Sequence, residues 1–178
     1  MSILKAQSFA IETSRLRLCW LELTDADFIY RLVNDPQWLR YIGDKQVSDL
    51  DEARRDIEDG PRTMYRQFGF GLNRVALKDS DTPIGICGLL QRDSLPLPDL
   101  GFAFLPEYRG QGYAWEAADA IMQHAFLILR QTQVAAIVNP DNHSSIKLLD
   151  KLGFRLDKQI QMEPNRDSVD LYVIHAEP

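Results

Sequence analysis

The chain contains a glycine-rich bend, Arg109-Gly110-Gln111-Gly112, directly ahead of a run of helix-forming residues that begins at Tyr113. The first N–H groups of a helix have no partner within the helix, and the helix dipole adds partial positive charge at this end. Glycines just before such a helix let the backbone approach a phosphate closely. The bend therefore predicts a phosphate-binding site, and a glycine turn without a ligand is the alternative.

Two common kinds of phosphate site do not fit this bend. The sequence has no G-x-x-x-x-G-K-[ST] motif, which argues against a P-loop. A dinucleotide fingerprint needs a third glycine in G-x-G-x-x-G, and Trp115 stands in its place. The chain also does not keep the strand–helix alternation that a Rossmann fold requires.

A second polar cluster, Asn142-His143-Ser144-Ser145, opens another stretch with apolar residues at helical spacing. Gly153 stands where a C-terminal glycine ends a helix. The amide and hydroxyl groups of this cluster can bind a polar ligand, or they can cap the helix.

The hydrophobic pattern predicts the strands that must position these two clusters. Alternating or β-branched runs predict strands at residues 15–22, 70–77, 83–91, 100–105, 133–138, 154–161 and 169–176.

Capping and breaking residues predict the helices. Thr24 offers an N-cap for a helix that Asn34-Asp35-Pro36 stops. Ser48 begins a second helix, which Gly60-Pro61 interrupts or kinks. A long helix follows the glycine-rich bend, and a shorter one follows Asn142. The resulting order is strand, two helices, three strands, helix, strand, helix and two strands.

This order predicts a mixed α/β fold in one domain over residues 1–178, with a largely antiparallel sheet. The stretch from Gly101 to Val138 is expected to form a parallel strand–helix–strand crossover within that sheet.

The composition is that of a globular protein with a core: 178 residues, 45 % hydrophobic and 26 % charged. The net charge of −6 argues against non-specific nucleic-acid binding, which needs a basic face. Cys19 and Cys87 lie in apolar runs and are expected to be buried, and no ligand spacing indicates a metal site. The longest apolar run, Ala125–Leu129, is too short to span a membrane, so we expect no membrane contact and a cytoplasmic location.

Three separated stretches carry a family resemblance. They are Arg109-x-x-Gly112-x-Ala114, the pairs Glu116-Ala117 and Ala125-Phe126, and Asn142-x-x-Ser145-x-x-x-Leu149-x-Lys151-Leu152-Gly153-Phe154. In this order and separation they resemble the GCN5-related N-acetyltransferase (GNAT) family, and within it the ribosomal-protein N-terminal (Rim) type. The first is similar to the family's acetyl-CoA pyrophosphate motif, Q/R-x-x-G-x-G/A. The looser resemblance of element order extends over nearly the whole chain.

The resemblance implies a single GNAT-like domain with a cleft for acetyl-CoA, its cosubstrate. The strands at 100–105 and Val134 are expected to splay apart around the pantetheine arm. The implied cofactor contacts are backbone groups near Phe104 and Leu105 for that arm, Arg109, Gly110, Gln111, Gly112, Tyr113 and Ala114 for the pyrophosphate, and Asn142 and Ser145 for the pantetheine or thiol end.

The resemblance also implies direct acyl transfer, in which a neutral amine attacks the thioester. Glu107, directly after the strand at 100–105, is the expected base, and a solvated loop carboxylate is its alternative role. Many family members place a tyrosine acid where this chain has Leu149. Ser145 is the expected substitute, with water as the other option.

The expected acceptor contacts are Trp38 and Tyr41, beside Arg40, in the connection between the first two helices. The first hypothesis for the acceptor is the N-terminal α-amino group of a ribosomal protein or another peptide. A small amine such as an antibiotic, polyamine or amino acid is the second, and a non-catalytic acyl-CoA-binding module is the third. The protein is expected to be a monomer or a homodimer without a metal.

Overall fold

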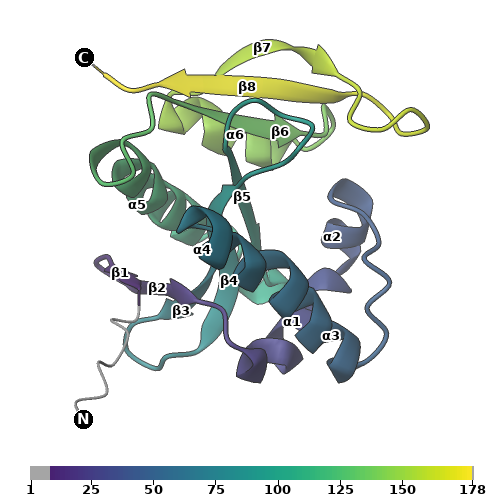
Figure 1. Cartoon of the computed structure of the whole chain (residues 1–178). Coiled ribbons are helices and arrows are strands. Elements are labelled where there is room, and N and C mark those ends of the chain that lie inside the picture. The colour runs from purple at the N-terminus through teal and green to yellow at the C-terminus, as the bar shows by residue number, and fades with distance from the viewer. Residues whose placement is uncertain (1–8, 178) are drawn as a thin grey trace.

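The computed structural model describes residues 9–177, which form an eight-stranded sheet in the order β1-β2-β3-β4-β5-β6-β8-β7 (Figure 1). The strands are β1 (Ala10–Glu12), β2 (Leu16–Trp20), β3 (Leu72–Leu77), β4 (Pro83–Leu90), β5 (Asp99–Phe104), β6 (Gln133–Val138), β7 (Arg155–Ile160) and β8 (Val169–His175). Neighbouring strands run antiparallel except β5 and β6. This confirms the mostly antiparallel α/β fold and the parallel crossover that the sequence predicts.

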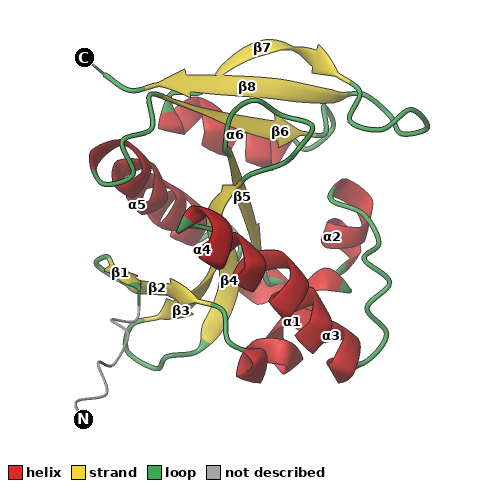
Figure 2. Cartoon of the chain, in the orientation of Figure 1, coloured by secondary structure: helices red, strands yellow, loops and turns green. Residues whose placement is uncertain are grey.

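Helices cover both faces of this sheet (Figure 2). They are α1 (Ala26–Val33), α2 (Pro36–Tyr41), α3 (Leu50–Ile57), α4 (Thr63–Phe68), α5 (Tyr113–Leu127) and α6 (His143–Leu152). One core cluster packs the sheet against α5, with Leu18, Val75 and Ile121 among its buried members. A second cluster on the other face joins α1 and α3 to the sheet through Leu32, Ile57 and Ile86. Among residues 9–177, none of the helices has the length and apolar character to cross a membrane.

The stretch after α1 differs from the sequence prediction. Helix α1 ends at Val33, as predicted, but Pro36 does not keep the chain out of a helix. It is the first residue of α2, where the missing N–H of proline costs nothing. The Asp35 carboxylate caps this helix by accepting hydrogen bonds from the N–H groups of Gln37 (3.0 Å) and Trp38 (3.4 Å).

Two other helix starts lie later than predicted. Thr24 belongs to a 3-10 turn, η1 (Leu23–Asp25), and α1 begins after it at Ala26. Asp49 rather than Ser48 caps α3, because the Asp49 carboxylate accepts from the Glu52 N–H at 2.8 Å. The Ser48 hydroxyl instead donates to the Glu52 carboxylate.

Gly60-Pro61 does not break the helical chain. A π-helical turn, η2 (Glu58–Arg62), contains both residues and leads directly into α4. The wider turn accommodates the proline, which has no N–H to donate. The short strand β1 was not predicted, since its three residues carry too little alternation to be recognised.

Candidate active site

Strands β5 and β6 form a fork. Among the described residues they pair only at Asp99 and Ala135, where the Ala135 N–H donates to the Pro98 carbonyl at 2.9 Å. Figure 1 shows β5 leading from the lower half of the sheet toward β6, β8 and β7. The predicted splay of these two strands is therefore present, and its apex is Asp99.

The β6-facing edge of β5 carries the backbone groups that a ligand in the fork would meet. The Leu105 N–H donates to the Ile84 carbonyl at 2.9 Å, so Leu105 bonds toward β4. Backbone groups alternate in direction along a strand, which turns those of Phe102 and Phe104 toward the gap. The cleft-facing donors are thus the N–H groups of Phe102 and Phe104, and Leu105 is not one of them.

The glycine-rich bend has the geometry of an anion site. Gly110 and Gly112 both take left-handed backbone conformations, with φ of 71° and 83°. Gly112 is the N-cap of α5, and its carbonyl accepts the first helical hydrogen bond from the Glu116 N–H at 3.1 Å. The N–H groups of Tyr113, Ala114 and Trp115 have no partner within the helix. Unpaired helix amides are donors suited to an anion, and phosphate binding here stays a prediction.

Arg15 also lies at this helix start, and sequence analysis missed it. Its guanidinium stacks over the Tyr113 ring, 4.3 Å from the centroid, and its Nη1 donates to the Gln111 carbonyl at 3.0 Å. Its Nε donates to Glu116 Oε2 at 2.7 Å. No local pattern marks Arg15, because the contact joins the start of β2 to a helix about a hundred positions later in the chain.

Glu116 connects α5 to the turn between β1 and β2. Its carboxylate accepts hydrogen bonds from Thr13 Oγ1 at 2.6 Å and from the Arg15 N–H at 2.8 Å. Burial raises the pKa of Glu116, but these hydrogen bonds and the Arg15 guanidinium outweigh burial and lower it overall. The glutamate of the predicted Glu-Ala pair is therefore ionised and tied to the β1–β2 turn.

The side chain of Arg109 bonds to groups outside the glycine-rich bend. Its Nε donates to the Phe104 carbonyl at 2.9 Å, and its Nη2 forms an ion pair with Asp35 Oδ2 at 2.6 Å. A cofactor contact through the Arg109 backbone stays a prediction. The guanidinium itself joins the end of β5 to the start of α2.

Glu107 lies in the 3-10 turn η3 (Pro106–Tyr108), directly after β5. Its carboxylate is half exposed and forms an ion pair with Arg31 at 2.8 Å. A hydrogen bond from its own N–H, followed by the Arg31 side chain, lowers the pKa of Glu107. Its carboxylate is ionised at neutral pH, and it is a weaker base than an unpaired glutamate.

Asn142 and Ser145 come together at the start of α6. Asn142 Oδ1 accepts hydrogen bonds from the Ser145 N–H at 3.3 Å and from Ser144 Oγ at 3.2 Å. Asn142 is therefore the cap of α6, and Ser145 contributes its backbone to that cap rather than its hydroxyl. Leu149 lies one turn further along and is 1 % exposed, so it offers no polar group.

The expected acceptor residues lie on α2. Trp38 is 5 % exposed and packs in the α1–α3 cluster, whereas Tyr41 is half-buried with the Arg40 guanidinium 4.9 Å from its ring centroid. A Cβ on Gly43 would lie 3.4 Å from Arg166 Nη1, so the segment after α2 meets the β7–β8 loop. Acceptor contacts by Trp38 and Tyr41 stay predictions.

Asp99 is a second carboxylate that sequence analysis did not single out. Its side chain is 1 % exposed, and Arg92 Nε donates to its two oxygens at 3.0 and 3.2 Å. Burial raises the pKa of Asp99, and Arg92 opposes this only in part. The sequence does contain a sign of this buried carboxylate, since Asp99 directly precedes the apolar run LGFAFL.

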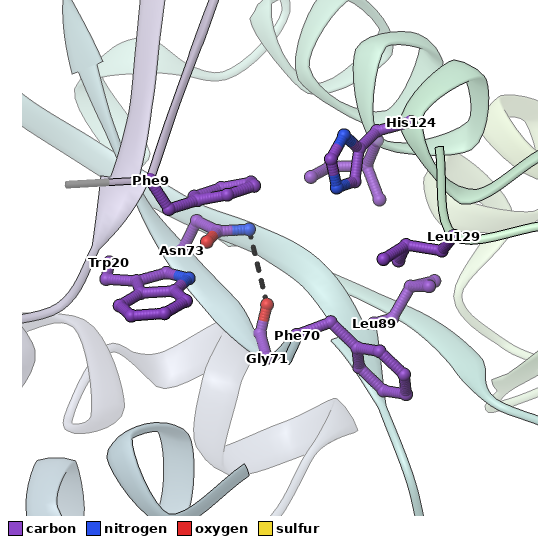
Figure 3. Close-up of a pocket in the computed structure, with 9 residues that line it drawn as sticks. Phe9, Trp20, Phe70, Gly71, Asn73, Leu89, His124 and Leu129 are labelled. Atoms are coloured by element: carbon purple, nitrogen blue, oxygen red, sulfur yellow. Dashed lines mark hydrogen bonds between the residues drawn. The ribbon is translucent and has the colours of Figure 1, made fainter. Parts of the chain in front are cut away.

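A groove and a small cavity lie outside the fork. A groove of about 580 Å³ covers the β6–β8–β7 part of the sheet, lined by Leu95, Ile160 and Leu171 among others. A smaller cavity of about 10 Å³ lies between Trp20, Asn73 and His124 (Figure 3), with room for about one water. The smaller cavity is too small for a substrate.

Comparisons with known proteins agree with this geometry. Residues 15–155 match the acetyltransferase (GNAT) domain. The chain is 34 % identical over 158 residues to the spermidine N(1)-acetyltransferase of Escherichia coli (strain K12), covering 80 % of this chain and 74 % of the relative. It is 29 % identical over 144 residues to the N-acetyltransferase p20 of Bacillus licheniformis, covering 80 % of each chain.

Solved structures share the fold at low identity. An acetyltransferase from Agrobacterium tumefaciens str. C58 superposes with a TM-score of 0.80 at 24 % identity, covering 99 % of each chain. The RimL ribosomal L7/L12 alpha-N-protein acetyltransferase has a TM-score of 0.80 at 12 % identity, covering 95 % of each chain. The domain match over 15–155, the fork and the amide-rich helix start together show that this chain belongs to the GNAT acetyltransferase family, whose members use acetyl-CoA, and that it is an N-acetyltransferase.

Proposed function

We propose that this enzyme transfers the acetyl group of acetyl-CoA directly to the N-terminal α-amino group of a protein or peptide, such as a ribosomal protein. The single observation that supports direct transfer is the fork between β5 and β6, which opens beside the start of α5. The cleft-facing edge of β5 would bind the pantetheine arm, and the amides from Gly110 to Ala114 would bind the pyrophosphate. Asn142 would contact the pantetheine or thiol end.

In this reaction the amine nitrogen bonds to the thioester carbonyl carbon, the carbon–sulfur bond breaks, and the sulfur takes up a proton. Glu107, which is ionised, accepts the proton that the amine loses, through a water molecule. The Phe102 or Phe104 N–H donates to the carbonyl oxygen as negative charge develops on it. Ser145 Oγ–H donates a hydrogen bond to the departing sulfur and relays a proton to it from a water molecule, which restores the hydroxyl, because Leu149 has no proton to give.

The groove of about 580 Å³ over β6, β8 and β7 supports the peptide assignment. Its lining residues Leu95 and Leu171 pack with Ala135, which lies at the apex of the fork. Leu171 and Tyr172 alternate along β8, and Tyr172 belongs to the α5 side of the core. The groove therefore lies on the face opposite α5, and a peptide could enter the fork from there.

A polyamine acceptor is the second candidate. The specific observation that favours it is the 34 % identity to a spermidine N(1)-acetyltransferase. The net charge of −6 also favours attraction of a polycation.

Acetyl-CoA consumption with matched acceptors separates the two. The panel would contain peptides with free N-termini, the same peptides with blocked N-termini, and spermidine, with released thiol as the readout. The peptide proposal expects turnover with the free peptides and none with the blocked ones. Turnover with spermidine alone would contradict it and support the polyamine candidate.

A further inference from the structure

Two ion pairs of opposite polarity join the segment that precedes α5 to the helices on the acceptor side. We call residues 106–112 the cofactor turn. Its Glu107 binds Arg31 of α1 at 2.8 Å, and its Arg109 binds Asp35, the N-cap of α2, at 2.6 Å. The cofactor turn is thus attached at one point to α1 and at another to the N-cap of α2, the helix that carries Trp38 and Tyr41.

These two ion pairs differ in burial. The side chains of Arg31 and Glu107 are 60 % and 48 % exposed, and such pairs contribute little to stability. The side chains of Asp35 and Arg109 are 5 % and 30 % exposed, and breaking a pair of this kind leaves a buried charge without a partner. The Asp35–Arg109 pair is therefore the one that fixes the relative position of its two segments.

Each partner of the buried pair also holds a neighbouring backbone group. Asp35 Oδ2 accepts from the N–H groups of Gln37 and Trp38, so it sets where α2 begins. Arg109 Nε donates to the carbonyl of Phe104, the last residue of the cleft strand β5. One ion pair thus connects the end of β5, the cofactor turn and the first turn of α2.

We propose that the Asp35–Arg109 pair couples acetyl-CoA binding to the acceptor side, with Arg109 as a positioning residue rather than a phosphate ligand. This rests on the proposed function for the placement of the pyrophosphate and the acceptor. Acetyl-CoA bound at the start of α5 restricts the motion of the cofactor turn. Through its ion pair with Asp35, Arg109 then restricts the motion of the N-terminus of α2 as well. Because coupling between two binding sites is reciprocal, acceptor bound against α2 strengthens acetyl-CoA binding by the same factor.

Hydrogen exchange with CoA as the probe tests this coupling without any acceptor. In the wild-type protein we expect CoA to slow amide exchange at residues 110–115 and also at residues 36–42. In Arg109→Gln the slowing at 110–115 should remain and the slowing at 36–42 should be lost. Asp35→Asn should give the same result, and it keeps the cap because asparagine is also a good N-cap residue.

Arg74→Gln is the matched control. Arg74 and Asp25 form another ion pair with both side chains 14 % exposed, at 3.1 Å, between β3 and η1. This variant should retain both CoA effects. Arg109→Lys, which keeps the charge, should recover part of the effect at 36–42.

Kinetics provide an independent readout. In Arg109→Gln the KM of the acceptor measured at saturating acetyl-CoA should rise at least about fivefold, the lower end of common coupling strengths. The Kd of CoA measured without acceptor should change much less. CoA protection at 36–42 that persists in both Arg109→Gln and Asp35→Asn would overturn the coupling, as would wild-type protection confined to 110–115. Absence of protection at 110–115 would instead remove the proposed function, and the coupling with it.

Discussion

Ser145 and Glu107 are the two side chains to which we assign proton transfers, and they lie on different elements. Ser145 lies at the start of α6, where Asn142 rather than the Ser145 hydroxyl performs the capping. Glu107 lies at the end of β5 and is held by Arg31. Each assignment can be tested with a substitution that leaves the neighbouring backbone contacts in place.

Ser145→Ala should lower kcat by about 100-fold, since a positioned proton donor contributes this much or more to such a step. The Kd of acetyl-CoA should stay the same, because the Ser145 N–H still completes the α6 cap. Steady-state kinetics and calorimetry with CoA measure the two effects. Ser144→Ala is the control on the next residue, and equal turnover in the two variants would remove Ser145 from the mechanism.

The pH dependence of kcat/KM distinguishes Glu107 from Asp99 as the base. The lowered pKa of Glu107 keeps it ionised throughout pH 6–9, so in that range the profile should follow the acceptor amine alone. With a peptide, kcat/KM should rise with a midpoint near pH 8, about the pKa of an α-amino group, and level off at higher pH. A separate acid limb that appears with every acceptor and vanishes in Asp99→Asn would assign the base to Asp99, whose pKa is raised.

The start of α5 is the element that we propose binds the pyrophosphate of acetyl-CoA. Arg15→Gln removes the guanidinium that bonds Gln111 and stacks over Tyr113. We expect the Kd of acetyl-CoA to rise about tenfold, the effect of one charge-assisted contact of about 1.4 kcal/mol. Arg17→Gln is the control, because Arg17 of β2 pairs with Glu12 of the neighbouring strand β1. Equal CoA affinity in both variants would contradict this role of Arg15.

Strand β4 requires a glycine at position 88, because the backbone of Gly71 lies very close to it. A Cβ on Gly88 would overlap the carbonyl oxygen of Gly71. Gly88→Ala should therefore lower the free energy of unfolding by about 2–3 kcal/mol, the usual cost of overpacking. Gly60→Ala has no heavy atom within 4 Å of its new Cβ and should lower it far less. Denaturant unfolding of both variants measures the difference.

Local pattern predicted the elements well where hydrophobic alternation or a glycine carries the signal. The strands from β3 to β8, the long helix α5 and the Gly153 end of α6 follow directly from the sequence. Helix α2 was not predicted because a proline is compatible with two positions. It can follow the end of one helix, and it can also be the first residue of the next, as Pro36 is here. Capping positions shifted by one or two residues because Asp49 and Ser48 are both good N-caps.

For the molecule as a whole, contacts between distant segments were beyond what the sequence could predict. The glycines of the bend indicated a phosphate site because glycine adopts positive φ readily and lets the backbone come close to a ligand. Arg15, however, reaches that site from the start of β2, and Asp35 reaches Arg109 from the start of α2. Such pairings depend on how the sheet and helices assemble, and no spacing within one segment encodes them.

The fold as a whole brings three regions of the chain to the fork: the end of β5 with the cofactor turn, the start of α6, and the α1–α2 segment. We propose that acetyl transfer occurs there in one direct step. The most direct test is product analysis by mass spectrometry during steady turnover with acetyl-CoA and an amine acceptor. We predict one N-acetylated acceptor for each free CoA thiol, with no acetyl group bound to the enzyme at any stage. An acetylated enzyme that passes its acetyl group to the acceptor, or thiol release without acetylated acceptor, would contradict direct transfer.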